Sequence, residues 1–82
     1  MKLPVIKHLA RENEAQKLEH TIEVLESYTE HRSVKDEEMD VIGELISNLC
    51  GAVEVKHSID SGTPEKDACN NFMQKVVGSI DR

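Results

Sequence analysis

The feature that most constrains this chain is a run of apolar residues at helical spacing in its middle third. From Met39 to Val53 the sequence reads MDVIGELISNLCGAV, and the pattern continues to Ile59. At roughly 100° per residue, these side chains cover one broad side of a helix, wider than a surface helix with one neighbour requires. The residues are Val41, Ile42, Leu45, Ile46, Leu49, Cys50, Ala52, Val53 and Ile59. The pattern predicts one long central helix, about residues 34–61, that packs against two or more partners.

Residues at both ends of this segment favour a helix that starts and stops there. Ser33 can accept a hydrogen bond from a free N–H of the first turn, and Asp36 stands three residues later, close to a capping box. The acidic residues that follow favour the positive end of the helix dipole. At the other end, Gly62 is suited to the left-handed conformation that terminates helices. We therefore expect Ser33 as the N-cap and Gly62 as the left-handed cap.

Three small residues form a second pattern along one edge of the predicted helix. Gly43, Ser47 and Gly51 recur at intervals of four. A glycine inside a helix costs roughly 1 kcal/mol relative to alanine, so two of them suggest that another helix approaches closely. That helix could belong to the same chain or to a second subunit. The three residues are candidates for a helix-packing or interface site.

Shorter amphipathic segments flank the central helix. Pro4 fits the first turn of an opening helix, and a second helix follows after a break around residues 12–14, with Asn13 and Gln16 as its predicted capping box. Thr63 and Pro64 are typical of a helix restart. The apolar positions of the three flanking helices are Leu3, Ile6, Leu9 and Ala10; Ala15, Leu18, Ile22, Leu25 and Tyr28; and Ala68, Cys69, Phe72, Met73, Val76, Val77 and Ile80. We predict an all-α fold, a small bundle of about four helices with a short first helix, as one domain over residues 1–82.

Composition argues against several classes of partner. Ten basic and sixteen acidic residues give a formal net charge of −6, which repels phosphate backbones and anionic lipids. Tyr28 and Phe72 are the only aromatic residues, so few side chains are available to stack on nucleic-acid bases. No apolar run approaches the length of a membrane span, and the first residues, MKLPVIKHLARENE, lack a small-residue cleavage site. We expect a cytoplasmic protein that binds neither nucleic acid nor membranes.

Two sets of residues were weighed as chemical sites. Cys50 and Cys69 fall on predicted apolar faces, outside any Cys-x-x-Cys spacing, so we expect buried reduced thiols; a redox pair is the alternative. Glu54 and His57 match the Glu-x-x-His element of dimetal bundles, but those sites need the element twice. A symmetric dimer could supply the second copy. The sequence assigns no catalytic residue, no metal ligand and no cofactor.

The segments MKLPVIKHLA, DEEMDVIGELISN and NNFMQKVVGSID resemble a small family of uncharacterised bacterial proteins of about this length. The resemblance spans nearly the whole chain and implies no activity and no functional residues. Genes of this family can neighbour thioredoxin- and peroxiredoxin-like genes, which implies at most an association with redox proteins.

Three hypotheses follow for the function. The first is a non-enzymatic helical interaction module that binds a protein partner or forms a homodimer. It rests on the broad apolar side of the central helix and on the stripe of small residues. The second is a thiol-redox accessory protein that uses Cys50 or Cys69, and the third is a metal-binding bundle that uses Glu54 and His57. The first is favoured, and no small-molecule substrate is inferred.

Overall fold

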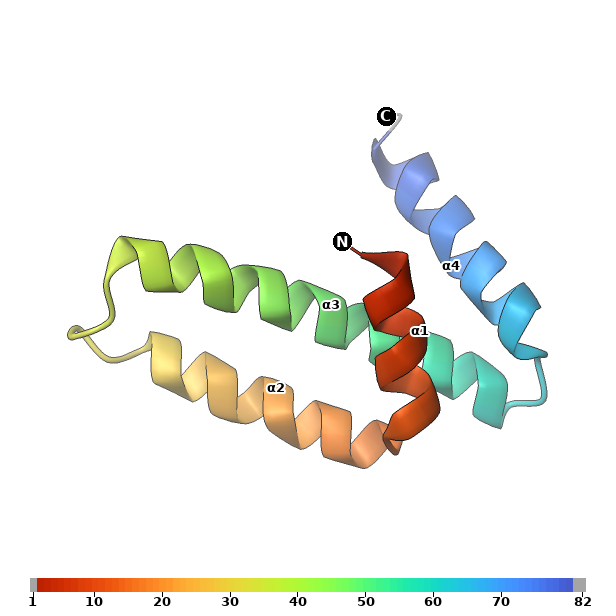
Figure 1. Ribbon diagram of the computed structural model, residues 1–82, viewed down its shortest axis with the longest axis horizontal. Helices are drawn as coiled ribbons and strands as arrows, with labels where there is room; N and C mark the ends of the chain where they lie inside the picture. Colours follow the sequence, from red (N-terminus) through yellow and green to blue (C-terminus); the bar gives the residue numbers. More distant parts are fainter. Residues whose placement is uncertain (1, 81–82) are drawn as a thin grey trace.

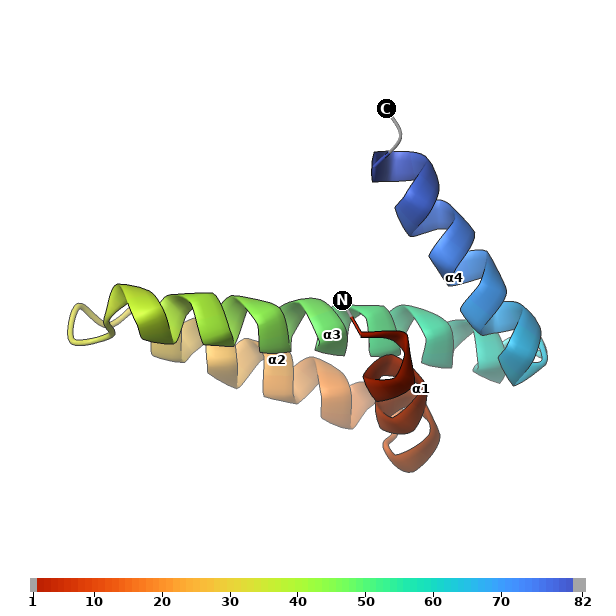
Figure 2. The same ribbon diagram turned by 45° about the horizontal axis from the view of Figure 1, so that its top comes forward.

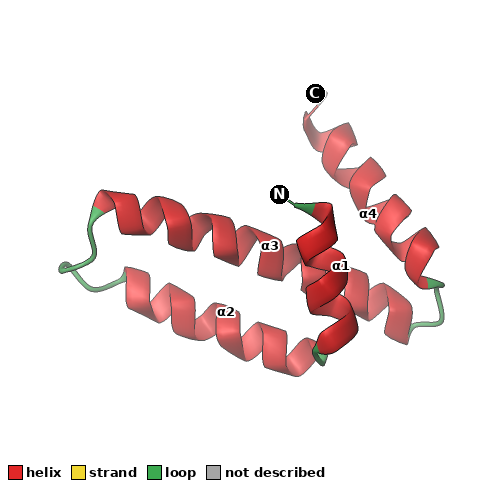
Figure 3. Cartoon of the chain, viewed as in Figure 1, coloured by secondary structure: helices red, strands yellow, loops and turns green. Residues whose placement is uncertain are grey.

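The computed structural model describes the backbone of residues 2–80 and the side chains of residues 2–76. Within that range the chain forms helices and loops and no strand (Figure 3). The helices are α1 (Leu3–Glu12), α2 (Ala15–Thr29), α3 (Asp36–Asp60) and α4 (Glu65–Ile80). The predicted all-α bundle with a short first helix is confirmed, and the long central helix lies within its predicted bounds. The predicted apolar residues Val77 and Ile80 lie outside the range of described side chains.

The α3 helix is the axis of the molecule, and each of the other helices packs against it. Helix α2 runs antiparallel beside α3, whereas α1 crosses the second half of α3 (Figure 1). Helix α4 turns back after α3 and touches it with its first half, while its second half projects from the body (Figure 2). The result is an elongated molecule of 42 × 31 × 17 Å. The expectation that the central helix has more than one partner is therefore confirmed.

The predicted start of the central helix is wrong by two residues. The N-cap is Lys35, whose backbone N–H donates to Glu38 Oε1 at 3.2 Å. Ser33 instead belongs to the preceding turn, where its N–H donates to His31 Nδ1 at 3.1 Å. Val34 N–H also donates to the carbonyl of His31, so residues 31–34 form a turn and the helix begins after it. Asp36, the expected partner of a Ser33 cap, is the first residue of α3.

The break between the first two helices is confirmed, but the predicted capping box of the second helix is wrong. Asn13 ends α1, because both its backbone N–H and its side-chain amide donate to the carbonyl of Leu9 at 3.1 Å. Glu14 is the N-cap of α2 and makes no side-chain capping bond. The amide of Asn13 is thus already engaged with the preceding helix.

The turn at Gly62 is formed as predicted. Gly62 has φ +106°, and its N–H donates to the carbonyl of Ile59 at 3.0 Å. Thr63 N–H donates to the carbonyl of Ser58 at 3.0 Å, which completes a Schellman motif. Helix α4 then begins at Glu65, one residue after the expected first position at Pro64, whose carbonyl accepts from Ala68.

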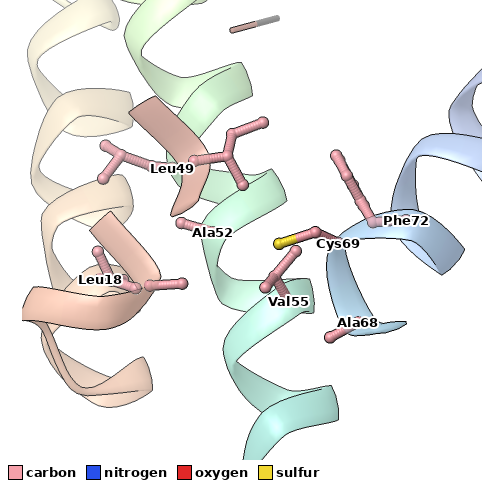
Figure 4. Close-up of a cluster of buried hydrophobic side chains, with 9 residues drawn as sticks. Leu18, Leu49, Ala52, Val55, Ala68, Cys69 and Phe72 are labelled. Carbon is pink, nitrogen blue, oxygen red and sulfur yellow. The ribbon is translucent and has the colours of Figure 1, made fainter. Parts of the chain in front are cut away.

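The core lies where α1, α2 and α4 meet the second half of α3. Its buried residues are Ile6, Ala10, Leu18, Leu49, Ala52, Val55, Ala68, Cys69 and Phe72 (Figure 4). Asn48 is also buried, and its amide is satisfied: Oδ1 accepts from Lys2 N–H at 2.9 Å, and Nδ2 donates to the carbonyl of Glu44 at 3.0 Å. Among the described side chains, no buried polar atom lacks a partner. The hydrogen bond between Lys2 N–H and Asn48 holds the start of α1 against α3.

The predicted apolar side of α3 is only partly buried, which is a correction. Ile42, Leu49 and Ala52 are buried, but Val41 is 60% exposed and Leu45 is 47% exposed. Val55, which the prediction left out, is 1% exposed. The first half of α3 is covered by α2 alone, whereas α1, α2 and α4 enclose its second half. Burial along α3 therefore changes with the number of partner helices at each level.

Candidate functional site

Two pairs of large apolar side chains lie exposed on two neighbouring helices, in addition to the single residue Met39 of α3. On α2 they are Val24, 68% exposed, and Tyr28, 53% exposed; on α3 they are Val41 and Leu45. Each pair is spaced by four residues, so its members lie on one face of their helix. Single exposed apolar residues are ordinary, but neighbouring exposed residues on packed helices form a surface that needs an explanation.

A groove runs between these helices near the loop that joins them. It has a volume of about 430 Å³ and is lined by Leu25, Tyr28, Glu37, Glu38, Val41 and Ile42. We call it the α2–α3 groove. A second hollow of about 310 Å³ shares Tyr28 and Glu38 with it and extends to His31, Ser33 and Val34 in the loop. The groove is therefore the larger part of an open depression at this end of the molecule.

The groove is open because α1 crosses α3 steeply, on its second half, and so does not reach this level (Figure 1). Along α3, Val41, Leu45, Asn48 and Ala52 follow one another at helical spacing, on overlapping faces. The first two are exposed, whereas Asn48 is 5% and Ala52 0% exposed. The change occurs where α1 begins to cross α3 (Figure 1). The same side of α3 is thus covered by a helix at one end and open at the other.

Two carboxylates lie among the apolar walls of the groove. Glu38 Oε2 accepts a hydrogen bond from the Tyr28 hydroxyl at 3.2 Å, while Oε1 accepts from Lys35 N–H. The bond to Glu38 raises the pKa of Tyr28, since the carboxylate disfavours the phenolate. This contact orients the ring of Tyr28 at the edge of the groove. Glu37 is exposed, and no lysine or arginine lines the groove.

A broader hollow of about 580 Å³ extends along α2 and meets the groove at Leu25. It is lined by Glu14, Gln16, Lys17, His20, Thr21, Val24 and Leu25. All of these residues come from α2 or its N-cap, so the hollow is the open flank of one helix. It extends the apolar surface through Val24 but brings no catalytic group together with a second element.

The three small residues of α3 lie in different surroundings. Gly51 is buried, and a Cβ built on it would lie 2.9 Å from both Ile6 Cδ1 and Phe72 Cζ. Gly43 is exposed, and a Cβ there would meet nothing within 4 Å. Ser47 is partly buried. Close packing within the chain therefore occurs at Gly51, while Gly43 lies on an open surface.

The two cysteines also differ. Cys69 is 1% exposed, and this burial raises the pKa of its thiol. Cys50 is exposed, so the expectation that it is buried is wrong. Both are free thiols, and they lie in unlike environments.

The residues weighed as metal ligands contact other protein side chains. Glu54 Oε1 binds Lys75 Nζ of α4 at 2.5 Å, and His57 Nε2 lies 3.1 Å from Glu19 Oε1 of α2. Among the side chains of residues 2–76, no three histidine, cysteine, aspartate or glutamate residues come close enough to hold a metal ion. These pairs link α3 to its neighbours.

The groove was not identified from the sequence as a site. Tyr28 was assigned to a buried face, and Val24 to none. One signal was available: Val24 stands outside the stripe formed by Leu18, Ile22 and Leu25, at a position that faces solvent. This residue lines the hollow along α2, which meets the groove at Leu25.

The helices within residues 2–80 lack an apolar stretch sufficient to cross a bilayer. No curated protein and no solved structure matches the chain. A family model does match, over residues 1–81, and it confirms the resemblance to a family without a known activity. The chain belongs to the family of unknown function DUF6952.

Proposed function

We propose that this protein is a non-enzymatic interaction module and that the α2–α3 groove is its binding surface. The observation that carries the proposal is the set of exposed side chains Val24, Tyr28, Val41 and Leu45 on two packed helices. Exposed apolar grooves between helices are typical binding places for protein segments.

The character of the groove supports a protein ligand. Its walls are aliphatic and aromatic, and its phenol and carboxylate are oriented by the chain's own hydrogen bonds. Aromatic side chains with one polar end are enriched at protein interfaces because they contribute a large apolar area at little entropic cost. Tyr28 has this arrangement, with its ring half exposed and its hydroxyl held by Glu38.

The test uses two variants, Val41→Asp in the groove and Leu45→Asp one turn further along the same face of α3, which we call the groove variants. They are compared with Val5→Asp, which alters a 39% exposed residue on α1. Solution mass is measured by light scattering over a dilution series, and proteins captured from the native cell are identified by mass spectrometry. We expect one complex, with a second copy or with another protein, that the wild type and Val5→Asp retain and both groove variants lose. Circular dichroism must show unchanged helix content in all variants.

The proposal fails if every complex formed by the wild type is also formed by Val41→Asp and Leu45→Asp. It also fails if the wild type stays near 9 kDa and captures no protein in a groove-dependent manner. Each of these outcomes would mean that the exposed side chains are not a binding surface.

The thiol-redox alternative now rests on Cys50, because its thiol is exposed whereas Cys69 is buried. A redox role requires that Cys50 react in the native protein. Resistance of Cys50 to iodoacetamide without denaturant would remove this alternative.

A further inference from the structure

The chain contains an example of a helix bound on the surface next to the groove. Helix α1 has ten residues and packs on α3, where Ile6 and Ala10 are 0% and 1% exposed. Beyond α1, the same side of α3 continues through Leu45 and Val41, with α2 still beside it. The side of α3 that binds α1 therefore continues toward the start of α3, through Leu45 and Val41.

The length of that stretch limits the size of the ligand. Seven residues separate Val41 from Asn48, where coverage by α1 is complete. At about 1.5 Å per residue this is about 10 Å, or roughly two helical turns. The depression also continues past Tyr28 toward the loop. A helix of two to three turns, similar to α1 in length, fits this space.

The negative charge of the groove favours a basic ligand over a second copy of this chain. The groove contains Glu37 and Glu38 and no basic side chain, and the whole chain has a net charge of −6. Face-to-face pairing of two copies would bring these carboxylates against their own counterparts, and like charges across an interface disfavour association. A ligand with lysine or arginine beside its apolar residues would complement them.

The bound helix α1 has this composition. Lys7 and Arg11 each directly follow one of its buried residues, Ile6 and Ala10. Arg11 forms an ion pair with Glu65 of α4, with 2.6 Å between Nη2 and Oε1. The chain thus already uses a short, basic amphipathic helix to cover this side of α3.

We infer that the α2–α3 groove binds one amphipathic helix of two to three turns from a different protein, with lysine or arginine flanking its apolar face. The inference deepens the proposed function and rests on it. Val41 and Leu25 in the groove, and Leu45 one turn further along α3, contact the apolar face of the ligand. Glu37 and Glu38 attract its basic flanks, and the ring of Tyr28 closes the end of the groove.

The probes are three fluorescein-labelled synthetic peptides with one identical apolar face. Their flanking positions are all lysine and arginine, all glutamine, or all glutamate. Binding to the full chain is followed by fluorescence anisotropy. We expect the basic peptide to bind about tenfold more tightly than the glutamine peptide, and the glutamate peptide to bind most weakly. Raising the salt from about 0.05 M to 0.5 M should reduce this preference, because screening lengths shorten.

Two variants and one control locate the binding. Leu45→Asp should abolish binding of the basic peptide, and Val5→Asp should leave it unchanged. Glu37→Gln should weaken the basic peptide about two- to fivefold and leave the glutamine peptide unaffected, since it removes one exposed charge. Glu37 is preferred to Glu38 for this test because Glu38 also accepts the N-cap hydrogen bond of α3.

Failure of the inference can be distinguished from failure of the proposed function. Equal binding of the basic and glutamine peptides, both lost in Leu45→Asp, would overturn the assigned charge but keep the groove as a binding surface. Binding of no peptide, together with a dimer that Leu45→Asp dissociates, would identify a second copy as the ligand and overturn the inference alone. Basic-peptide binding that survives Leu45→Asp would be attraction to the acidic surface and would overturn the inference. Absence of peptide binding and of any groove-dependent complex would overturn both.

Discussion

Alanine substitutions at two glycines of α3 test how closely the helices pack. The substitution at the exposed Gly43 serves as the reference for the same substitution at the buried Gly51. Gly43 is open, so Gly43→Ala should stabilise the fold by about 1 kcal/mol, the difference in helix propensity. At Gly51 the same gain is opposed by a Cβ only 2.9 Å from both Ile6 Cδ1 and Phe72 Cζ. Ordinary carbon contacts begin near 3.5 Å, so these side chains must move by about 0.6 Å or more.

The expected cost of that movement is about 1–3 kcal/mol, because Ile6 and Phe72 are themselves buried and have little room to yield. Gly51→Ala should therefore range from neutral to about 2 kcal/mol less stable than the wild type, after the roughly 1 kcal/mol propensity gain. The two variants should differ by about 1–3 kcal/mol. In a domain of this size, each 1 kcal/mol shifts the melting temperature by about 4–8 °C.

The assay is urea unfolding followed by circular dichroism, at two protein concentrations. Equal stabilisation by both substitutions would refute the close approach of α1 and α4 at Gly51. A difference that appears only at the higher concentration would place the contact between chains rather than within one. Unchanged m-values would show that both variants unfold from the same compact state.

Three further predictions follow from the core, the thiols and an ion pair. Ile6→Ala should lower the free energy of unfolding by about 2–5 kcal/mol in urea, since it leaves a cavity among four helices. Iodoacetamide should modify Cys50 in the native protein and leave Cys69 largely unmodified, as mass spectrometry of peptides would show, because Cys69 is buried and its thiol pKa is raised. Arg11 holds the pKa of Glu65 below its ordinary value of 4.5, so this pair stabilises the fold above that pH and stops doing so as the pH falls through the lower folded pKa. Glu65→Gln should therefore melt slightly below the wild type at pH 7, and the gap should close in acid or in high salt.

Each of these has a control that can contradict it. Val5→Ala, on the exposed side of α1, should change stability by about 0.5 kcal/mol or less; an effect as large as that of Ile6→Ala would mean that α1 is not seated as described. Cys50→Ser should eliminate the fast alkylation, and rapid labelling that persists would place the reactive thiol at Cys69. A melting difference for Glu65→Gln that shrinks neither in acid nor in high salt would show that it does not arise from the ion pair with Arg11.

Helical periodicity was sufficient to predict the number of helices, their order and the residues that share a face. It could not show where each partner helix crosses α3. Val41 and Ala52 belong to the same apolar side of α3, yet one is exposed and the other enclosed because α1 crosses only the second half of α3 (Figure 1). Burial therefore depends on the neighbours at each level of the helix, and the crossing angles of those neighbours are not encoded in the periodicity of α3.

Local capping signals were ambiguous for a related reason. Ser33 and Asn13 are both suitable N-caps by residue type. In the structure, however, Ser33 donates to His31 in the preceding turn, and the side chain of Asn13 donates to Leu9 at the end of α1. The burial of Asn48 was also beyond the sequence, because one of its partners is the backbone N–H of Lys2, 46 residues away. The apolar residue Val24, at a solvent-facing position of α2, was a visible sign of the hollow beside the groove but not of the groove itself.

The position of α4 has a consequence for how the molecule opens. This helix packs on α3 with its first half, and its ion pairs with Arg11 and Glu54 lie at the surface. Proteins release such peripheral segments at a lower free energy than they unfold globally. Detachment of α4 would uncover Cys69 while α1–α3 stay folded. The rate at which iodoacetamide modifies Cys69 should therefore depend on how often α4 detaches. Dividing that rate by the rate in the unfolded chain gives the equilibrium constant for detachment of α4.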